Sequence, residues 1–104
     1  MITAIVRFQM PEGTTLEDAT KLFEASADKY RGLDGLVRKY YLYGEGAAAG
    51  GAYLWESREA ADRLYTSEWK AMMQERYGVE PTVEYFDSPV IVDNAADRVS
   101  AAAE

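Results

Sequence analysis

The chain has 104 residues, a net charge of −7, 48% hydrophobic residues and 28% charged residues. This size and balance are typical of one soluble globular domain with a modest core. Its 18 acidic residues outnumber its 11 basic ones, and its only adjacent basic pair is Arg38–Lys39, so we expect neither nucleic acid nor an anionic membrane surface as a partner.

Cysteine and histidine are both absent from the sequence. Without cysteine there is no disulfide scaffold and no thiol nucleophile, and a cytoplasmic location is the expected one. Without histidine the chain lacks the usual general base and the commonest ligand of metals and haem. We therefore expect no metal and no cofactor, and any catalysis must use tyrosine, lysine, arginine, tryptophan, asparagine or carboxylate side chains, or chemistry intrinsic to the substrate. No signal peptide and no apolar run of transmembrane length are expected either.

The first half of the sequence predicts a strand, a helix and a hairpin. Apolar residues alternate through Ile2–Gln9, which is the period of a strand. Thr14 and Glu17 have the spacing of a capping box, and the helix that follows should end at Gly32. Its apolar stripe comprises Leu16, Ala19, Leu22, Phe23, Ser26, Ala27 and Tyr30. Two strands are expected at about 36–43 and 51–55, joined by a Gly/Ala loop over 44–50.

The second half predicts two short helices and a last strand. Ser57 should cap the first helix, and Thr66 or Ser67 a second one over Glu68–Tyr77 that ends at Gly78. The first of these helices carries Ala60, Ala61, Leu64 and Tyr65 inward, and the second carries Trp69, Met72, Met73 and Tyr77. A strand is expected at Pro81–Asp87 and a short apolar extension at Val90–Val92. We expect one domain over residues 1–94 and a frayed or loosely helical tail over 95–104.

The predicted order β-α-β-β-α-β is that of the ferredoxin-like α+β fold, with helices on one face of a four-stranded antiparallel sheet. In a monomer the other face of the sheet should be polar. The second and third strands, however, carry apolar or aromatic residues on both faces. This pattern predicts that the second face is buried against a copy of the chain, forming a homodimer.

The stretches "GLVRKYYLY", "AGGAYLWESREAA" and "VEYFDSPV" resemble the YdhR-like mono-oxygenases of the dimeric α/β-barrel superfamily, which also includes the cofactor-independent antibiotic-biosynthesis monooxygenases. The likeness runs from about Met1 to Asn94 and is most specific over Ala49–Trp55. It implies a homodimeric α/β barrel with a small-molecule cavity in each subunit. The chain departs from the family at Arg38, where an aromatic residue is expected, and at Tyr43, where a polar one is.

The hairpin predicts an aromatic wall on one face of the sheet. With a loop over 44–50, Tyr43 would pair with Gly51, Tyr41 with Tyr53, and Lys39 with Trp55, so that all six share one face. Such a wall would offer ring surfaces, phenolic donors and one ammonium to a planar ligand. The alternative is that these rings only pack, because aromatic pairs are ordinary sheet stabilisers. In the binding interpretation, Tyr53 and Trp55 are the outward pair of their strand.

Three further residues are candidates for binding. Trp69, in the first turn of its helix, would close the mouth of a cavity, and Met73 would line it; the alternative for both is plain core. Arg7 lies in the middle of a strand, and is either a surface residue or a cation paired inside a cleft. No acidic spacing predicts a metal site.

The first functional hypothesis is a cofactor-independent monooxygenase acting on a small phenolic or quinol-like aromatic, which can itself reduce dioxygen. Lys39, Tyr41 and Tyr53 would be catalytic, with Lys39 or Arg7 facing a phenolate. The substrate-binding residues would be Arg7, Tyr43, Trp55, Trp69 and Met73. Two alternatives stay open: a non-catalytic protein that binds an aromatic metabolite, and an isomerase or lyase on the same fold.

Overall fold

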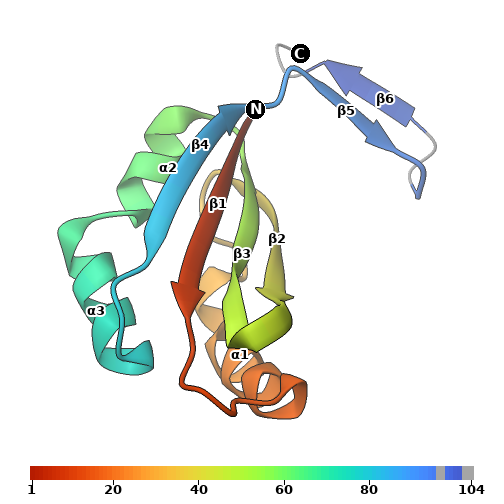
Figure 1. The fold of residues 1–104 in the computed structure, drawn as a ribbon. Helices are drawn as coiled ribbons and strands as arrows, with labels where there is room; N and C mark the ends of the chain where they lie inside the picture. The colour runs from red at the N-terminus through yellow and green to blue at the C-terminus, as the bar shows by residue number, and fades with distance from the viewer. Residues whose placement is uncertain (96–97, 102–104) are drawn as a thin grey trace.

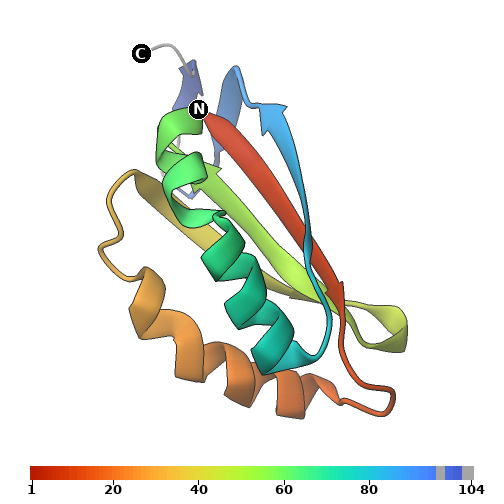
Figure 2. The same ribbon diagram turned by 90° about the vertical axis from the view of Figure 1, so that its left-hand side faces the viewer.

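The computed structural model describes residues 1–95 and 98–101, the last four by their backbone alone. Four strands form an antiparallel sheet in the order β2-β3-β1-β4, with bounds Ile2–Gln9 for β1, Leu36–Tyr43 for β2, Ala48–Trp55 for β3 and Thr82–Asp87 for β4. Three helices, α1 (Leu16–Tyr30), α2 (Arg58–Leu64) and α3 (Ser67–Tyr77), lie on one side of this sheet (Figures 1 and 2). The predicted ferredoxin-like α+β fold is confirmed.

Strand β1 is the central support of the sheet, because it pairs with both β3 and β4. Its alternation is confirmed: Ala4, Val6 and Phe8 are buried beneath the helices, while Arg7 and Gln9 are exposed on the other face. We call that other face, which no helix covers, the open face.

The β2–β3 hairpin differs from its prediction in register. Strand β3 begins at Ala48, earlier than expected, because a short 3-10 turn over Glu45–Ala47 completes the reversal. The observed pairs are Tyr43 with Ala49, Tyr41 with Gly51, and Lys39 with Tyr53. The predicted pairs were therefore wrong by two residues, but a shift of two keeps every side chain on its face. The predicted common face is correct, and it is the face that the helices cover.

Helix α1 begins one residue later than the sequence pattern predicts. Its capping box is formed by Thr15 and Asp18, with the Asp18 amide donating to Thr15 Oγ1 at 3.1 Å and the Thr15 amide donating to Asp18 Oδ2 at 3.2 Å. The Thr14 hydroxyl instead donates to the carbonyl of Pro11. The buried stripe of α1 is narrower than predicted. Leu16, beside a groove along β2, is 62% exposed, and Leu22 is 39% exposed.

Helices α2 and α3 follow their predicted caps. The Ser57 side chain accepts the amide of Ala60, and the Thr66 side chain accepts the amide of Trp69. Gly78 ends α3 in the left-handed conformation, with φ 84°. The break between the two helices lets α3 run beside α1 (Figure 2).

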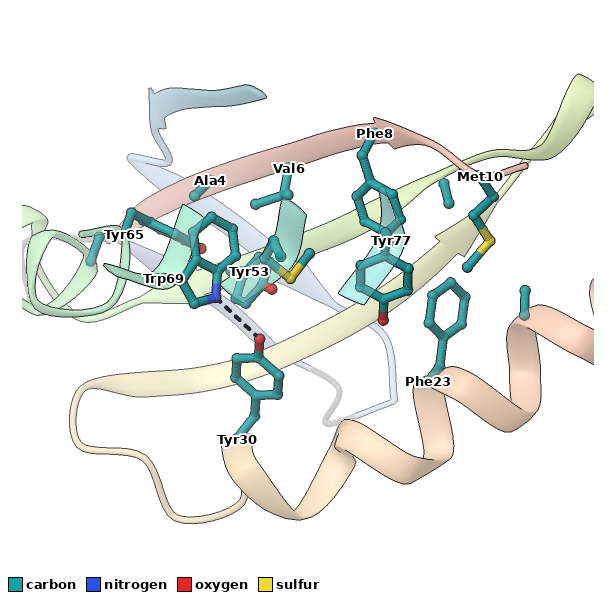
Figure 3. Close-up of a cluster of buried hydrophobic side chains, with 14 of the residues drawn as sticks. Ala4, Val6, Phe8, Met10, Phe23, Tyr30, Tyr53, Tyr65, Trp69 and Tyr77 are labelled. Carbon is teal, nitrogen blue, oxygen red and sulfur yellow. Dashed lines mark hydrogen bonds between the residues drawn. The ribbon is translucent and has the colours of Figure 1, made fainter. Parts of the chain in front are cut away.

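The core between sheet and helices is unusually aromatic. Trp55 is 0% exposed and Tyr53 2%, and both pack edge-on against Tyr65 of the α2–α3 junction. Tyr65 in turn contacts Trp69, whose indole N–H donates to the Tyr30 hydroxyl at 3.3 Å (Figure 3). The prediction that Tyr53 and Trp55 are an outward pair is wrong, since they face inward.

Beyond β4 the chain forms a second, two-stranded sheet. Strand β5 (Val90–Asp93) pairs antiparallel with β6 (Arg98–Ala101), and this hairpin projects away from the main sheet (Figure 1). Part of the segment expected to be a frayed or helical tail is thus a strand, while residues 96–97 and 102–104 lie outside the described residues. The boundary at residue 94 stays a prediction.

Large apolar side chains are exposed on and beside the open face. Tyr40 is 56% exposed, Leu42 40% and Phe86 50%, and Val90 and Val92 on the hairpin are each 63% exposed. In the part of the chain that the structure describes, no helix is long and apolar enough to cross a membrane.

Gly50 fixes how closely β1 and β3 approach, and this generates the first prediction. A Cβ at Gly50 would lie 1.8 Å from the Val6 carbonyl oxygen, whereas one at Gly44, in the nearby turn, would meet nothing nearer than 3.9 Å. Gly50→Ala should therefore destabilise the fold by ~1–3 kcal/mol or more through overpacking. Gly44→Ala is the matched control and should change stability little. Urea unfolding of both variants beside the wild type measures this, and equal stability of the two would contradict the close approach.

Candidate functional site

A cavity lies between the sheet and helices α1 and α3, and we call it the Lys39 cavity. It encloses about 380 Å³, counting the part open to solvent. Strands β1 and β3 supply its floor and β2 one wall, and the two helices cover it. Its lining residues are Val6, Phe8, Gly50, Tyr53, Lys39 and Tyr41 from the strands, and Phe23, Ser26, Lys29, Tyr30, Met72, Met73, Arg76 and Tyr77 from the helices.

The amine of Lys39 sits among three tyrosine rings. Its Nζ lies 3.5 Å from the ring centroid of Tyr30, 3.8 Å from that of Tyr41 and 4.6 Å from that of Tyr53. The electron-rich ring faces attract a cation, but they offer no strong hydrogen-bond acceptor. Within residues 1–95, no carboxylate lines the cavity and no salt bridge reaches Lys39.

The sequence of the hairpin explains why Lys39 reaches this place. Lys39 and Tyr41 are two residues apart on β2, so both point toward the helices. Tyr41 pairs with Gly51, where a Cβ would lie 2.9 Å from the Tyr53 ring and 3.3 Å from Lys39 Cε. The missing side chain at Gly51 therefore leaves the space that the lysine stem and the Tyr53 ring occupy.

Burial, the largest cause, acts together with the positive charges of Lys29 and Arg76 to lower the pKa of Lys39 to about 7. Both causes act in the same direction, because desolvation and like charges each disfavour the ammonium. Near neutral pH the group is therefore divided between amine and ammonium. An amine in this state can accept a proton, and the resulting ammonium can face an anion.

The tyrosines around the cavity are hydrogen-bond donors rather than bases. Burial raises the pKa of Tyr53 and also that of Tyr41, whose hydroxyl shares a 2.8 Å hydrogen bond with Ser26. Phenols held neutral in this way can donate to a substrate oxygen without competing with Lys39 for its proton.

The cavity is narrow in the ligand-free chain. The centre of a water-sized sphere has only about 20 Å³ to move in, which is room for about one water molecule. An aromatic ligand must therefore displace side chains that now fill the space. Met72 and Met73 are suited to this, because methionine is unbranched and repacks readily.

The structure brings four of the predicted site residues together, namely Lys39, Tyr41, Tyr53 and Met73. Lys39 differs from its prediction in its neighbours, since it lies over three tyrosines and pairs with Tyr53 rather than with Trp55.

The structure does not bring the other four predicted residues to the cavity lining. Arg7 is on the open face and pairs with Glu84 at 3.1 Å. The Tyr43 hydroxyl donates to the carbonyl of Thr14. Trp55 is a core residue whose indole N–H donates to Tyr65 at 3.0 Å. Trp69 packs behind Tyr30 instead of closing a mouth (Figure 3).

Sequence reasoning missed the contribution of the helices to the site. Tyr30 was placed on the buried stripe of α1, but nothing marked it as a wall of the cavity. Arg76 follows Met72 and Met73 by about one helical turn, so it falls on the same side of α3. That spacing is the feature of the sequence that could have placed Arg76 at the cavity. Lys29 gave none, because a lysine near a helix C-terminus is common.

Metal ligation finds no support in the described residues, because no group of three or more Asp, Glu, His or Cys side chains is placed to hold an ion there.

No protein-family model matches this sequence, and no curated protein is significantly similar to it. Solved structures do match. One is a monooxygenase from the gene ActVA-Orf6 of Streptomyces coelicolor in complex with nanaomycin D, with a TM-score of 0.63, 18% identity, and coverage of 84% of this chain and 86% of that one. SnoaB, a cofactor-independent oxygenase from Streptomyces nogalater, matches with a TM-score of 0.58, 17% identity, and coverage of 84% and 91%.

A further structure, described as an antibiotic biosynthesis monooxygenase, matches with a TM-score of 0.62, 14% identity, and coverage of 85% of this chain and 98% of that one. At these identities the comparisons show the fold. The chain has the ferredoxin-like α+β fold found in antibiotic biosynthesis monooxygenases.

The lowered pKa of Lys39 predicts how stability depends on pH. Between about pH 7 and the ordinary lysine value of about 10.4, the unfolded chain binds a proton at this residue that the folded chain does not. The contribution of Lys39 to stability therefore rises with pH through this window, by up to ~1.4 kcal/mol per pH unit. Below pH 7 the penalty for charging the buried amine is fully present.

The measurement is urea unfolding of the wild type and Lys39→Met at several pH values in that window. The difference between them isolates Lys39, since other groups titrate alike in both. The free energy of unfolding of the wild type should increase relative to that of the variant as pH rises. Lys70→Met, on α3 but outside the cavity lining, is the control. A pH-independent difference would mean that Lys39 keeps an ordinary pKa.

Proposed function

We propose that the protein is a cofactor-independent monooxygenase acting on a small phenolic or quinol-like aromatic bound in the Lys39 cavity. The observation that carries this proposal is the buried Lys39 amine, surrounded by tyrosine rings and without a carboxylate partner among residues 1–95. A base that is partly neutral at neutral pH, held in an aromatic cavity, suits a substrate with a planar ring and an acidic hydroxyl.

The first chemical step is proton transfer. The Lys39 amine accepts the proton of the phenol, and the new ammonium stabilises the phenolate that remains. Tyr41 can donate its hydroxyl hydrogen to the same oxygen. Each of these interactions strengthens as charge develops on the substrate, which is the requirement for catalysis rather than simple binding.

The second step is oxidation of the phenolate ring by dioxygen. The ring carbon forms a bond to one oxygen atom, and the O–O bond then breaks. That oxygen becomes a new carbonyl and the other leaves as water, so the phenol and dioxygen give a quinone and water. All the electrons come from the substrate. The protein's part is to hold the anion and exclude water.

The names of the matching structures support the class of reaction. They include a monooxygenase bound to nanaomycin D and a cofactor-independent oxygenase. Membership of the YdhR-like group within this fold, which the opening stretches indicate, remains our hypothesis.

A second candidate is an isomerase or lyase, and the same Lys39 favours it. A neutral amine beside hydroxyl donors can remove a proton next to a carbonyl without any oxidant. A third, non-catalytic binding role would use the cavity without turnover. Oxygen consumption separates the first candidate from both of the others.

The decisive prediction is incorporation of oxygen from dioxygen. With ¹⁸O₂ and a panel of naphthols and hydroquinones, a substrate should yield a quinone carrying one labelled atom, above the rate without protein. Lys39→Met should lower kcat by about 10²–10⁴-fold, the usual range for a general base. Tyr41→Phe should lower it by about 10²-fold through loss of one donor.

Lys70→Met should retain the wild-type rate. Saturable binding of the whole panel without labelled product would contradict the oxygenase proposal and favour the binding role. A rearranged product without label would favour the isomerase or lyase.

We also propose that the protein is a homodimer whose open faces pack together. The support is the exposed apolar set on β2 and β4, continued by Val90 and Val92 on the β5–β6 hairpin. Of these side chains, Tyr40, Val90 and Val92 line a groove between the open face and β5. At ~25 cal/mol per Å² of apolar area, burying a few hundred Å² per subunit supplies several kcal/mol before association costs.

The dimer predicts different outcomes for two exposed leucines. Leu42 lies on the open face, whereas Leu16 lies at the start of α1 beside the groove along β2, and both are exposed. Leu42→Glu should weaken association by ~2 kcal/mol or more, because a charge would be buried in the interface. Leu16→Glu should not. Sedimentation equilibrium measures this; a wild-type monomer at micromolar concentration would contradict the proposal.

A further inference from the structure

Most of the described basic side chains of this acidic chain form salt bridges, and most of those that do not lie around one cavity. Within residues 1–95, six basic side chains form salt bridges: Arg7, Lys21, Arg31, Arg38, Arg58 and Arg63. Among residues 1–95, the cations left without a carboxylate are Lys29, Lys39, Lys70 and Arg76. Three of these four line the Lys39 cavity. The chain has a net charge of −7, so this grouping of basic side chains without carboxylate partners distinguishes the cavity from the rest of the described residues.

Lys29 and Arg76 reach across the cavity from opposite helices. The Lys29 ammonium, from α1, contacts the thioether sulfur of Met72 on α3. The Arg76 guanidinium, from α3, donates to the carbonyl of Leu22 on α1 at 3.1 Å. Both are exposed at their outer sides, so they border the entrance, while Lys39 lies deeper among the rings.

The present partners of these two cations are uncharged: Lys29 contacts a thioether, and Arg76 contacts a backbone carbonyl and the ring of Tyr77, whose centroid is 5.7 Å from the guanidinium carbon. A thioether is a poor acceptor and a backbone carbonyl carries no charge. An anionic group would form charge-assisted hydrogen bonds with both cations and would replace these contacts favourably. It would also relieve the repulsion among three positive groups that no salt bridge within residues 1–95 now offsets.

We propose that Lys29 and Arg76 bind a carboxylate carried by the substrate, so that the substrate class is a hydroxylated aromatic acid. This inference rests on the proposed function in one respect, which is that the hydroxylated ring lies at Lys39. The carboxylate anchors one end of the molecule at the entrance, and the ring extends inward to the tyrosines. Arginine matches the two oxygens of a carboxylate with two parallel donors.

The placement also gives the carboxylate a role in orientation. A flat ring in an aromatic cavity can bind in several orientations, because ring contacts are not strongly directional. A fixed anion at the entrance selects the orientation that points the hydroxyl at Lys39. It also keeps the two negative groups of the ionised substrate next to separate cations.

The test uses three ligands that share one ring and differ in one substituent: 2-naphthoate, 2-naphthalenemethanol and 2-naphthyl phosphate. Isothermal titration calorimetry measures the dissociation constant of each for the wild-type protein. We expect 2-naphthoate to bind about tenfold more tightly than the alcohol, since one charge-assisted contact is enough for such a ratio. The preference should weaken as salt concentration rises.

The variants assign the preference to particular side chains. Arg76→Met and Lys29→Met should each remove most of it while leaving the affinity for the alcohol nearly unchanged. Arg76→Lys should keep part of the preference for the carboxylate. This variant also tests the role of Arg76 if the methionine variant does not fold. Lys70→Met removes the fourth unpaired cation, on α3 but outside the cavity, and should keep the full preference.

Each contrary outcome overturns the inference. Equal binding of naphthoate and alcohol would mean that the entrance does not recognise an acid. A preference for the naphthyl phosphate would replace the carboxylate with a phosphate. Failure of all three ligands to bind would overturn both the cavity and the proposed function. A carboxylate preference without labelled oxygen product would leave this inference standing and remove only the oxygenase.

Discussion

The organisation of the site depends on one constraint, the enclosure of an amine by tyrosine rings with no carboxylate paired to it in the described part of the chain. Ring faces attract the charged form of Lys39, while burial and two neighbouring cations oppose it. The balance keeps the group able to change protonation near neutral pH. Its surroundings follow from this: Gly51 leaves room for the lysine stem, Tyr41 is held by Ser26, and Tyr30 is held by Trp69. An acidic side chain in place of Tyr30 or Tyr41 would hold Lys39 in its charged form, and the residue would no longer change protonation near neutral pH.

The fold was predictable from local patterns, because each pattern states a single physical requirement. Alternation in β1, side-chain caps at Ser57 and Thr66, and the left-handed stop at Gly78 all describe short-range geometry, and the structure agrees. The hairpin register was not predictable, since it depended on where the Gly/Ala segment reverses. The capping box moved by one residue for a similar reason, because Thr14 and Thr15 are followed by acids at the same spacing.

The site was only half predictable, because a cavity is a property of packing between elements distant in the sequence. Reading one hairpin identified Lys39, Tyr41 and Tyr53, but it could not show which helices would cover them. Tyr30, Lys29 and Arg76 entered only with the placement of α1 and α3. Trp55 looked like part of a binding surface because aromatic strand residues fit both roles equally well. Its full burial and its hydrogen bond to Tyr65 decide for packing.

Both tryptophans are buried next to rings that line the cavity, Trp55 on Tyr53 and Trp69 beside Tyr30, but only Trp69 is hydrogen-bonded to a lining residue. Trp55 is enclosed in the core and bonded to Tyr65, so its emission should follow unfolding. Trp69 is one hydrogen bond from Tyr30, whose ring forms the cavity wall (Figure 3). A ligand that moves Tyr30 changes the polarity around the Trp69 indole without touching it. Unfolding exposes both buried indoles, so emission measured below the unfolding transition can follow entry to the cavity in the unlabelled molecule.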